Sequence, residues 1–275
     1  MKDIPNYDHI KVTYVTHFYC DKEDSINALY RLLETFATYS KEVLDQVHFV
    51  LVDDCSSIEV PPKDFGLNIT WLKITDDIPW NNPGARNLGV TYAKSDNIVI
   101  TDTDHLLPED TLAYLCTRGR CGRNFYKFRR RRPDGSTGRG HSNLFFMSRG
   151  RFMELFGYDE QFCGHYAHDD MWFVKFKKWH GCRQMYLPAK YKSKLRRDIT
   201  KGETHSLNRD QSINTALYEG KRKETALYGD GRGHSRNFLD FNWKILHKHN
   251  RPAPTPKENK LWQKLWWFRI LNPFG

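Results

Sequence analysis

The first part of the chain alternates between short runs of β-branched or other apolar residues and longer stretches in which apolar residues recur every three or four positions. The short runs predict strands, and the longer stretches predict amphipathic helices. The expected strands are 9–16, 48–52, 69–74 and 97–101, and the expected helices are 23–39, 84–93 and 108–115. This alternation predicts an α/β fold with a mostly parallel central sheet flanked by helices.

The pattern changes in the second half of the chain, where a glycine-rich loop at 135–140 separates two expected strands. The expected elements of this part are strands at 124–132, 143–148 and 182–187 and helices at 151–156 and 169–179. From about residue 190 the sequence is polar and basic. We therefore expect a C-terminal extension, helical or irregular, over 211–275.

The composition excludes several classes of protein. The 275 residues allow one large or two modest domains at roughly 150 residues per domain. Hydrophobic residues make up 39% and aromatic residues 14%, which is too apolar for a disordered chain. The sequence has neither a run of roughly 18 apolar residues nor the apolar segment of a signal peptide. We expect a cytoplasmic protein whose six cysteines are reduced thiols.

Basic residues outnumber acidic residues by 43 to 33, which gives a formal net charge of +10. This excess is compatible with nucleic acid, an anionic membrane surface or a phosphorylated substrate as a partner. The one dense basic run, Arg129-Arg130-Arg131-Arg132, directly precedes the turn sequence Pro133-Asp134-Gly135. We interpret the run as a solvated hairpin and expect no nucleic-acid partner, because no aromatic residues interleave it and no nucleic-acid-binding motif accompanies it.

Acidic residues follow two of the expected strands. Asp53 and Asp54 close the second strand, and Asp102-Thr103-Asp104 closes the fourth. Ligands of open α/β sheets bind beyond the carboxyl ends of the strands. Two carboxylates around one residue at a strand end can hold a divalent cation against a diphosphate. By itself such a pattern is also typical of solvated loops.

Six motifs follow one another in a specific order. They are a first strand ending at Thr16, then Asp53-Asp54, Ala85-Arg86-Asn87, Asp102-Thr103-Asp104, Gly157-Tyr158-Asp159-Glu160, and Asp169-Asp170 at a helix start. Over roughly residues 9–210 their order and spacing resemble inverting nucleotide-sugar glycosyltransferases of the GT-A fold, close to family 2. The second half also resembles the β-1,4-galactosyltransferase branch, in Gly164–Asp170 and His205-Ser206.

The resemblance implies a GT-A domain over 1–210, with a nucleotide-binding half at about 1–120 and an acceptor half at about 121–210. It also implies donor-binding roles for individual residues. Thr16 would lie beside the nucleobase or ribose, and Asp54 would accept a hydrogen bond from uracil N3–H. Arg86 would contact the base or the diphosphate as a fixed cation.

The resemblance further implies a metal site and a catalytic base. Asp102 would contact the ribose or a metal-bound water, Asp104 would ligate the metal, and His205 would be a third ligand. This donor set favours Mn²⁺, or Mg²⁺ in its place. Asp169 would take the proton of the acceptor hydroxyl. The family pattern has Glu where this chain has His168, so His168 and Asp170 compete for that role.

Each of these residues also has a structural interpretation. Asp54 could belong to an acidic turn, Arg86 could form a surface ion pair, and His205 could be merely solvated. Asp169-Asp170 could cap a helix N-terminus. Two aromatic residues, Trp80 and Tyr166, are candidates for stacking on sugar rings, although core packing is the more frequent role of single aromatic residues.

The resemblance implies transfer of a sugar from a nucleotide donor, with UDP as the expected nucleotide, to a hydroxyl group of a glycan or lipid-linked acceptor, as in polysaccharide biosynthesis. Two other classes stay open. A basic nucleic-acid-binding protein would leave the carboxylates at the strand ends unexplained. A metal-dependent phosphohydrolase would need a denser set of Asp and His ligands for a two-metal site.

The C-terminal end combines a proline-rich spacer at 252–256 with the aromatic and basic segment 261–268. Aromatic and basic residues together suit the surface of an anionic bilayer, which predicts a peripheral membrane contact. The alternative, which we favour slightly, is that this segment docks on the protein itself and buries its tryptophans.

Overall fold

The computed structural model describes residues 6–132, 134–196, 206–229 and 233–254. An eight-stranded sheet forms its centre, in the order β10-β6-β9-β4-β1-β2-β3-β12. Its strands are β1 (Val12–Phe18), β2 (Val47–Asp53), β3 (Asn68–Ile74), β4 (Asn97–Asp102), β6 (Asn124–Lys127), β9 (Phe145–Ser148), β10 (Arg183–Tyr186) and β12 (Trp243–His249). A second, four-stranded sheet has the order β5-β11-β7-β8. Its strands are β5 (His105–Leu106), β7 (Arg129–Arg131), β8 (Thr137–Gly138) and β11 (Lys192–Leu195).

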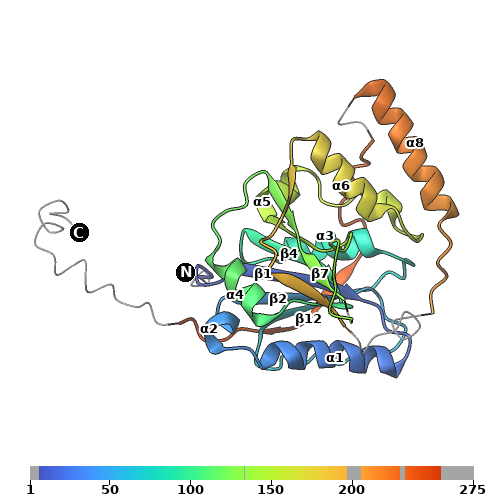
Figure 1. Ribbon diagram of the computed structural model, residues 1–275. Coiled ribbons are helices and arrows are strands. Elements are labelled where there is room, and N and C mark those ends of the chain that lie inside the picture. Colours follow the sequence, from blue (N-terminus) through green and yellow to red (C-terminus); the bar gives the residue numbers. More distant parts are fainter. Residues whose placement is uncertain (1–5, 133, 197–205, 230–232, 255–275) are drawn as a thin grey trace, which may run out of the picture.

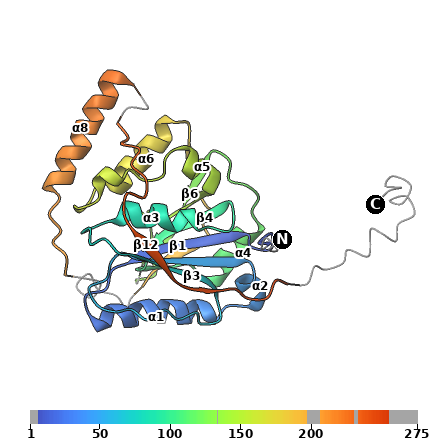
Figure 2. The same ribbon diagram turned by 180° about the vertical axis from the view of Figure 1, so that it is seen from behind.

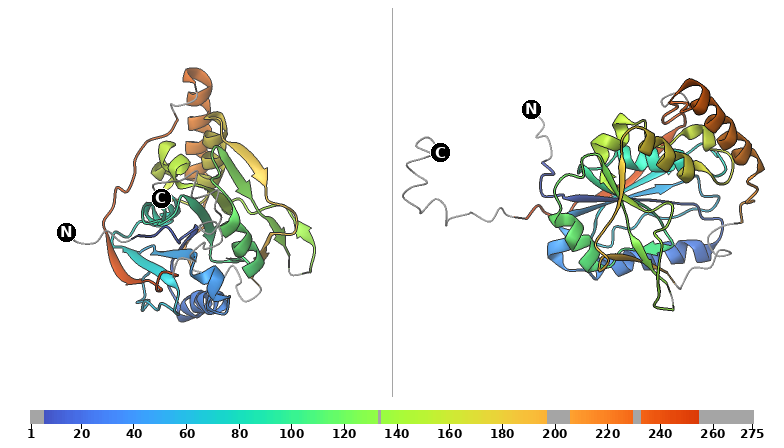
Figure 3. Two further views of the ribbon diagram at one scale, coloured as in Figure 1. Left: turned by 90° about the vertical axis from the view of Figure 1, so that its left-hand side faces the viewer. Right: turned by 45° about the horizontal axis from the view of Figure 1, so that its top comes forward.

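Helices cover both faces of the central sheet (Figures 1 and 2). One face carries α1 (Glu23–Ala37), α2 (Lys41–Leu44) and α4 (Glu109–Thr117), and the other carries α3 (Asn82–Thr91), α5 (Arg149–Glu154) and α6 (Asp169–Trp179). A further helix, α8 (Ser212–Tyr228), packs on the outer side of α6 (Figure 3). The predicted α/β fold with a mostly parallel sheet is confirmed.

The four strands in the middle of the sheet pair in parallel, in the order β4-β1-β2-β3. Every residue of β2 is buried, which agrees with its continuous apolar sequence and with helices on both faces. Each face has its own core. An aromatic cluster of Tyr14, Phe36 and Phe49 lies under α1, while Tyr158 and Phe173 stack with ring centroids 4.1 Å apart under α6.

The predicted helices and strands up to residue 120 all occur, with ends shifted by up to three residues. The expected strand 124–132 is divided in the structure. Asn124–Lys127 pairs in the central sheet, and Arg129–Arg131 pairs in the second sheet. The buried ring of Phe128 lies at the division between the two strands. One run of sequence therefore contributes to both sheets.

The segment after residue 210 is joined to the rest of the molecule by α8 and β12. Strand β12 pairs antiparallel with β3 and forms an edge of the central sheet. Lys221 on α8 forms a buried ion pair with Asp159, with Nζ 2.8 Å from the carboxylate oxygen. The aromatic segment expected at a membrane or on the protein, 261–268, lies outside the described residues.

All six cysteines are free thiols, as expected. In the part of the chain that the structure describes, no helix has both the length and the apolar character needed to cross a bilayer.

Candidate functional site

A cavity of about 630 Å³ lies beyond the carboxyl ends of β1, β2 and β4. Both halves of the chain line it. The first half contributes the ends of these strands and the start of α3, and the second half contributes the loop at 141–143 and the start of α6. The volume is within the usual range for small-molecule sites. The predicted residues that line it are Asp54, Trp80, Arg86, Asp102, Asp104, Tyr166, Asp169 and Asp170.

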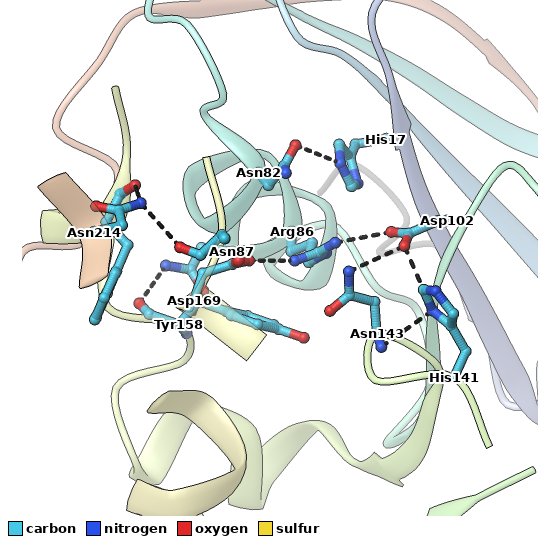
Figure 4. Close-up of polar contacts among 12 residues, drawn as sticks. His17, Asn82, Arg86, Asn87, Asp102, His141, Asn143, Tyr158, Asp169 and Asn214 are labelled. Carbon is cyan, nitrogen blue, oxygen red and sulfur yellow. Dashed lines mark hydrogen bonds and ion pairs between the residues drawn. The ribbon is translucent and has the colours of Figure 1, made fainter. Parts of the chain in front are cut away.

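Arg86 lines this cavity and connects the two halves of the chain (Figure 4). Its Nη1 donates to Asp169 Oδ2 at 2.7 Å, and its Nη2 donates to Asp102 Oδ1 at 2.8 Å. The Arg86 side chain is only 1% exposed, so these are ion pairs shielded from water. The interpretation of Arg86 as a surface ion pair is therefore wrong: its guanidinium bridges two carboxylates from distant parts of the sequence.

The neighbouring residue Asn87 also links α3 to the second half of the chain, through hydrogen bonds. Its Oδ1 accepts a hydrogen bond from the backbone N–H of Tyr158 at 2.8 Å, and its Nδ2 donates to Glu160 Oε1 at 2.8 Å. Gly157 has φ +64°, and a Cβ there would lie 2.3 Å from Asn87 Oδ1. Glycine at 157 therefore permits both the left-handed turn and the approach of Asn87.

The two carboxylates that pair with Arg86 have opposite pKa shifts. Burial raises the pKa of Asp169 to about 6, and the charges of Asp170 and Asp102 add to the rise, while Arg86 opposes it. Burial also acts to raise the pKa of Asp102, but Arg86, His17 and His141 outweigh it and hold that pKa well below its usual range. Asp102 is therefore a permanent anion, and Asp169 is a group that can exchange a proton near neutral pH.

A group of three residues beside Asp102 has the donor types of a metal site. Potential ligand atoms of Asp104, His105 and His141 lie within 4.8 Å of one another. His105 is fully buried, and its Nε2 has no hydrogen-bond partner within the described structure. Asp102 lies alongside, 3.7 Å from His141 Nδ1. Carboxylate and imidazole ligands with one unsatisfied nitrogen fit a manganese ion.

His141 is a residue that the sequence analysis missed. It lies in an irregular loop just after the glycine-rich stretch, without the regular spacing that marks a metal-binding motif. The predicted third ligand, His205, lies outside the described residues. The only available signal for His141 was a histidine between Gly140 and Ser142 in an otherwise uninformative loop.

Asp54 lies in the cavity as predicted, and its environment is unusual. The carboxylate is buried, and its Oδ1 has no hydrogen-bond partner among the described residues. Burial, with a contribution from the neighbouring charge of Asp53, raises the pKa of Asp54 to about 8. An oxygen without a partner in a cavity wall is available to accept a hydrogen bond from a water molecule or a ligand. This burial argues against the alternative of a solvated acidic turn.

The structure corrects two of the predicted positions. Thr16 is fully buried, and its hydroxyl donates to the Thr101 carbonyl oxygen at 3.0 Å, so Thr16 does not line the cavity. His17, one residue further along β1, lines it instead. Alternation along a strand places consecutive side chains on opposite faces, so this shift of one residue decides which side chain meets a ligand.

His168 likewise does not line the cavity. It has φ +68°, and its ring stacks on Tyr218 with Nε2 2.9 Å from Thr215 Oγ1. Both partners belong to α8, so the ring faces that helix. The competition for the role of base is therefore reduced to Asp169 and Asp170, which both line the cavity.

The two candidate stacking residues lie together at the cavity. The ring centroids of Trp80 and Tyr166 are 4.5 Å apart, and Trp80 Nε1 donates to the Asn208 carbonyl oxygen at 2.6 Å. Both side chains are half-buried and line the cavity, so the core-packing alternative is wrong for this pair.

Comparison with known proteins finds matches among solved structures. No protein-family model matches the chain, and no curated protein matches it. Among solved structures, S. aureus TarS 1–349 in complex with UDP-GlcNAc is similar at a TM-score of 0.57 and 12% identity, over 78% of this chain and 67% of that chain. S. aureus TarS 1–349 without that ligand is similar at a TM-score of 0.51 and 15% identity, over 67% of this chain and 60% of that chain.

The likeness shows the fold. The chain has the GT-A fold that the motifs led us to expect, with a central, mostly parallel sheet flanked by helices. The identity is too low to transfer individual residues, so the roles of the site residues rest on their geometry in this chain.

Proposed function

We propose that this protein is a metal-dependent inverting glycosyltransferase that uses a UDP-sugar. The observation that carries the proposal is the Arg86 bridge, because it fixes a strand-end carboxylate and a helix-start carboxylate on the two sides of one cation in one cavity. The similar TarS structure in complex with UDP-GlcNAc supports a nucleotide sugar as the donor. The acceptor would be a hydroxyl group of a glycan or of a lipid-linked glycan.

The donor half of the site follows from the groups at the strand ends. The unpartnered Oδ1 of Asp54 would accept the N3–H of a uracil base. Asp104, His105 and His141 would hold the metal ion, with Asp102 beside them. When bound, Mn²⁺ or Mg²⁺ would neutralise the charge that develops on the leaving diphosphate. Arg86 would add a second, fixed positive charge near that group.

The acceptor half follows from the start of α6. With a pKa of about 6, Asp169 is ionised at neutral pH and yet basic enough to take a proton. Arg86 holds one of its oxygens, which leaves the other to meet the acceptor hydroxyl. Asp169 would remove that proton as the oxygen attacks the anomeric carbon on the face opposite the leaving group. A single displacement of this kind inverts the configuration of the sugar.

The test is calorimetry of UDP binding with and without Mn²⁺. Native protein should bind UDP more tightly in the presence of Mn²⁺, and this difference should disappear in Asp104→Ala and shrink strongly in His141→Ala. Asp170→Asn is the matched control and should keep the difference, because it changes a cavity carboxylate outside the metal group. An equal Mn²⁺ effect in Asp104→Ala would refute the metal site.

The two alternative functions predict different results in two further experiments. A nucleic-acid-binding protein should be stabilised against heating by duplex DNA, whereas UDP with Mn²⁺ should stabilise a nucleotide-sugar enzyme. A phosphohydrolase should release inorganic phosphate from UDP. The described residues contain one group with metal-ligand geometry, whereas a two-metal hydrolase needs two.

A further inference from the structure

The four-stranded sheet places like charges side by side. In the parallel pairing of β7 with β11, Arg129 is the partner of Lys192 and Arg131 is the partner of Lys194. Residues paired in this way project from the same side of a sheet, and two like charges there destabilise it. Two successive pairs of cations are therefore a structural cost that nothing in the fold itself requires.

Acidic residues do not neutralise this charge. Arg131 and Lys194 are exposed, and within the described parts of the chain no ion pair joins either of them to a carboxylate. The sequence analysis interpreted the arginine run at 129–132 as a solvated hairpin. The structure contains this hairpin, and it also places the cations of β7 beside the cations of β11.

One of the two opposed pairs, Arg131 and Lys194, lines a groove of about 900 Å³ between α1, the β7–β8 hairpin and β11. Its basic lining residues outnumber its acidic ones. The basic ones are Arg31, Arg131, Arg132, Lys194 and Arg196, and the acidic ones are Glu34 and Asp134. The groove has room for more than one anionic group.

The groove adjoins the proposed metal site. Leu195 and Arg196 line both the groove and the cavity. The backbone N–H of Arg196 donates to the Asp104 carbonyl oxygen at 2.9 Å, and Arg196 Nη1 donates to the Thr103 carbonyl oxygen at 3.0 Å. A ligand chain lying in the groove would therefore pass Leu195 and Arg196 to reach the metal site. Arg196 is held by these two hydrogen bonds against the Asp102-Thr103-Asp104 turn.

We infer that the groove binds an acceptor that is itself an anionic, phosphate-bearing chain, an inference that rests on the proposed glycosyl transfer. Guanidinium groups match phosphate oxygens in geometry as well as in charge. Three of the five basic residues named above carry a guanidinium group on α1 or in the arginine run, namely Arg31, Arg131 and Arg132. The donor diphosphate has its own partners in the cavity, so the groove serves a different ligand. Bound phosphates would neutralise the opposed pair of Arg131 and Lys194.

The experiment measures binding of a short inorganic polyphosphate chain to the full-length protein by calorimetry, over a series of salt concentrations. Arg131→Glu and Lys194→Glu should each weaken binding by roughly tenfold or more, since each places a carboxylate against the polyanion. The salt dependence should fall by about one unit of slope per removed cation, as for other phosphate contacts. Lys223→Glu, on the exposed face of α8, is the matched control and should change little.

Two further readouts separate the groove from the donor site. UDP affinity in the presence of Mn²⁺ should be unchanged in Arg131→Glu and Lys194→Glu, and saturating polyphosphate should not displace UDP when the free Mn²⁺ concentration is held constant. In the free protein, Lys194→Gln should raise the melting temperature by about 1–3 °C, because it removes one repulsive pair. A variant that merely misfolds would lose UDP binding and stability together.

Polyphosphate binding that both charge reversals leave intact would overturn the inference, as would competition between polyphosphate and UDP. Tighter binding of duplex DNA than of polyphosphate at the same salt concentration would also overturn it, because the groove would then be a nucleic-acid site. If polyphosphate binds through the groove but UDP with Mn²⁺ does not bind at all, the anion site stands and its assignment to an acceptor fails with the proposed function.

Discussion

The buried carboxyl group of Asp54 lowers the free energy of unfolding near neutral pH and lies where it can bind a ligand. In the folded protein its pKa is about 8, well above the usual value of a carboxyl group, so the folded state binds a proton that the unfolded state has released. The free energy of unfolding that depends on Asp54 is therefore highest below about pH 4 and falls as the pH rises towards 8. The protein retains this unfavourable group at the place where a base would bind.

We predict that Asp54→Asn raises the melting temperature by several degrees at pH 8 and has little effect near pH 4, because it removes a buried charge that forms only at the higher pH. UDP affinity at pH 8 should fall about fivefold, since an amide accepts a weaker hydrogen bond than a carboxylate. Melting curves at both pH values and UDP calorimetry measure this. CDP is the control ligand, because its ring N3 cannot donate a hydrogen bond; a variant less stable than the native protein at pH 8 would contradict the prediction.

Asp169 and Asp170 are adjacent, and they differ in that Asp169 is more deeply buried and accepts a hydrogen bond from Arg86. We predict that Asp169→Asn lowers the transfer rate by about 10²–10⁴, the usual effect of losing a general base, with UDP affinity unchanged. In the native protein the rate should fall as the pH drops through about 6, because protonated Asp169 cannot accept the acceptor proton. If Asp170→Asn is inactive and Asp169→Asn is not, the base is Asp170.

At the scale of secondary structure, α8 holds the loop that leads to the base. The side-chain amide of Asn214 donates to the carbonyl oxygens of Phe162, His165 and Ala167, at distances of 3.1, 2.8 and 2.9 Å. The last residues of this loop, Ala167 and His168, have φ values of +77° and +68°. Two successive non-glycine residues in the left-handed region are strained, and such strain persists only where surrounding contacts fix it.

We predict that Asn214→Ala lowers stability by about 1–3 kcal/mol, because it leaves buried carbonyl groups without a donor. It should also lower the transfer rate, while UDP affinity with Mn²⁺ stays unchanged, because the loop carries Tyr166 and leads to Asp169 but not to the metal group. Urea unfolding and steady-state kinetics measure the two effects. Ile213→Ala, at an exposed position beside it, is the control. A loss of UDP affinity equal to the loss of rate would contradict this positioning role.

At the scale of the whole molecule, the part after residue 210 completes the sheet and the outer helical layer. Without β12, strand β3 would become an exposed edge. Without α8, Asp159 would lose the Lys221 ammonium inside the protein, and an unpaired buried charge costs about 3–5 kcal/mol.

A chain that ends at residue 210 should therefore unfold at a much lower temperature than the full chain, or fail to accumulate in folded form. A chain that ends at residue 242 retains α8 and lacks β12, and we expect its melting temperature to lie between the other two. Circular dichroism during heating measures all three. Equal melting temperatures for the full chain and the chain ending at 210 would show that residues 1–210 form a complete folding unit.

The sequence by itself determined the alternation of helices and strands up to residue 120, the helix at Asp169–Trp179, and the presence of Asp54, Arg86 and Asp102 in one site. The helices and strands follow from local periodicity, and the common location of Asp54 and Asp102 follows from the rule that parallel strands end at the same edge of a sheet. The place of Arg86 in the site is what the family resemblance implies. The tertiary structure decided features that depend on distant partners. It placed His141 beside Asp104, joined Asp102 to Asp169 through Arg86, and turned His168 towards α8.

The remaining differences have the same physical origin. Which of Thr16 and His17 faces the cavity depends on the register and end of β1, and a shift of one residue exchanges the two faces of a strand. The polar, basic sequence of α8 and β12 carries little periodic signal, because the residues that α8 buries are mostly polar and no residue of β12 is fully buried. Only pairing with β3 and packing on α6 made these segments part of the fold, since those contacts supply the burial that their own sequence lacks.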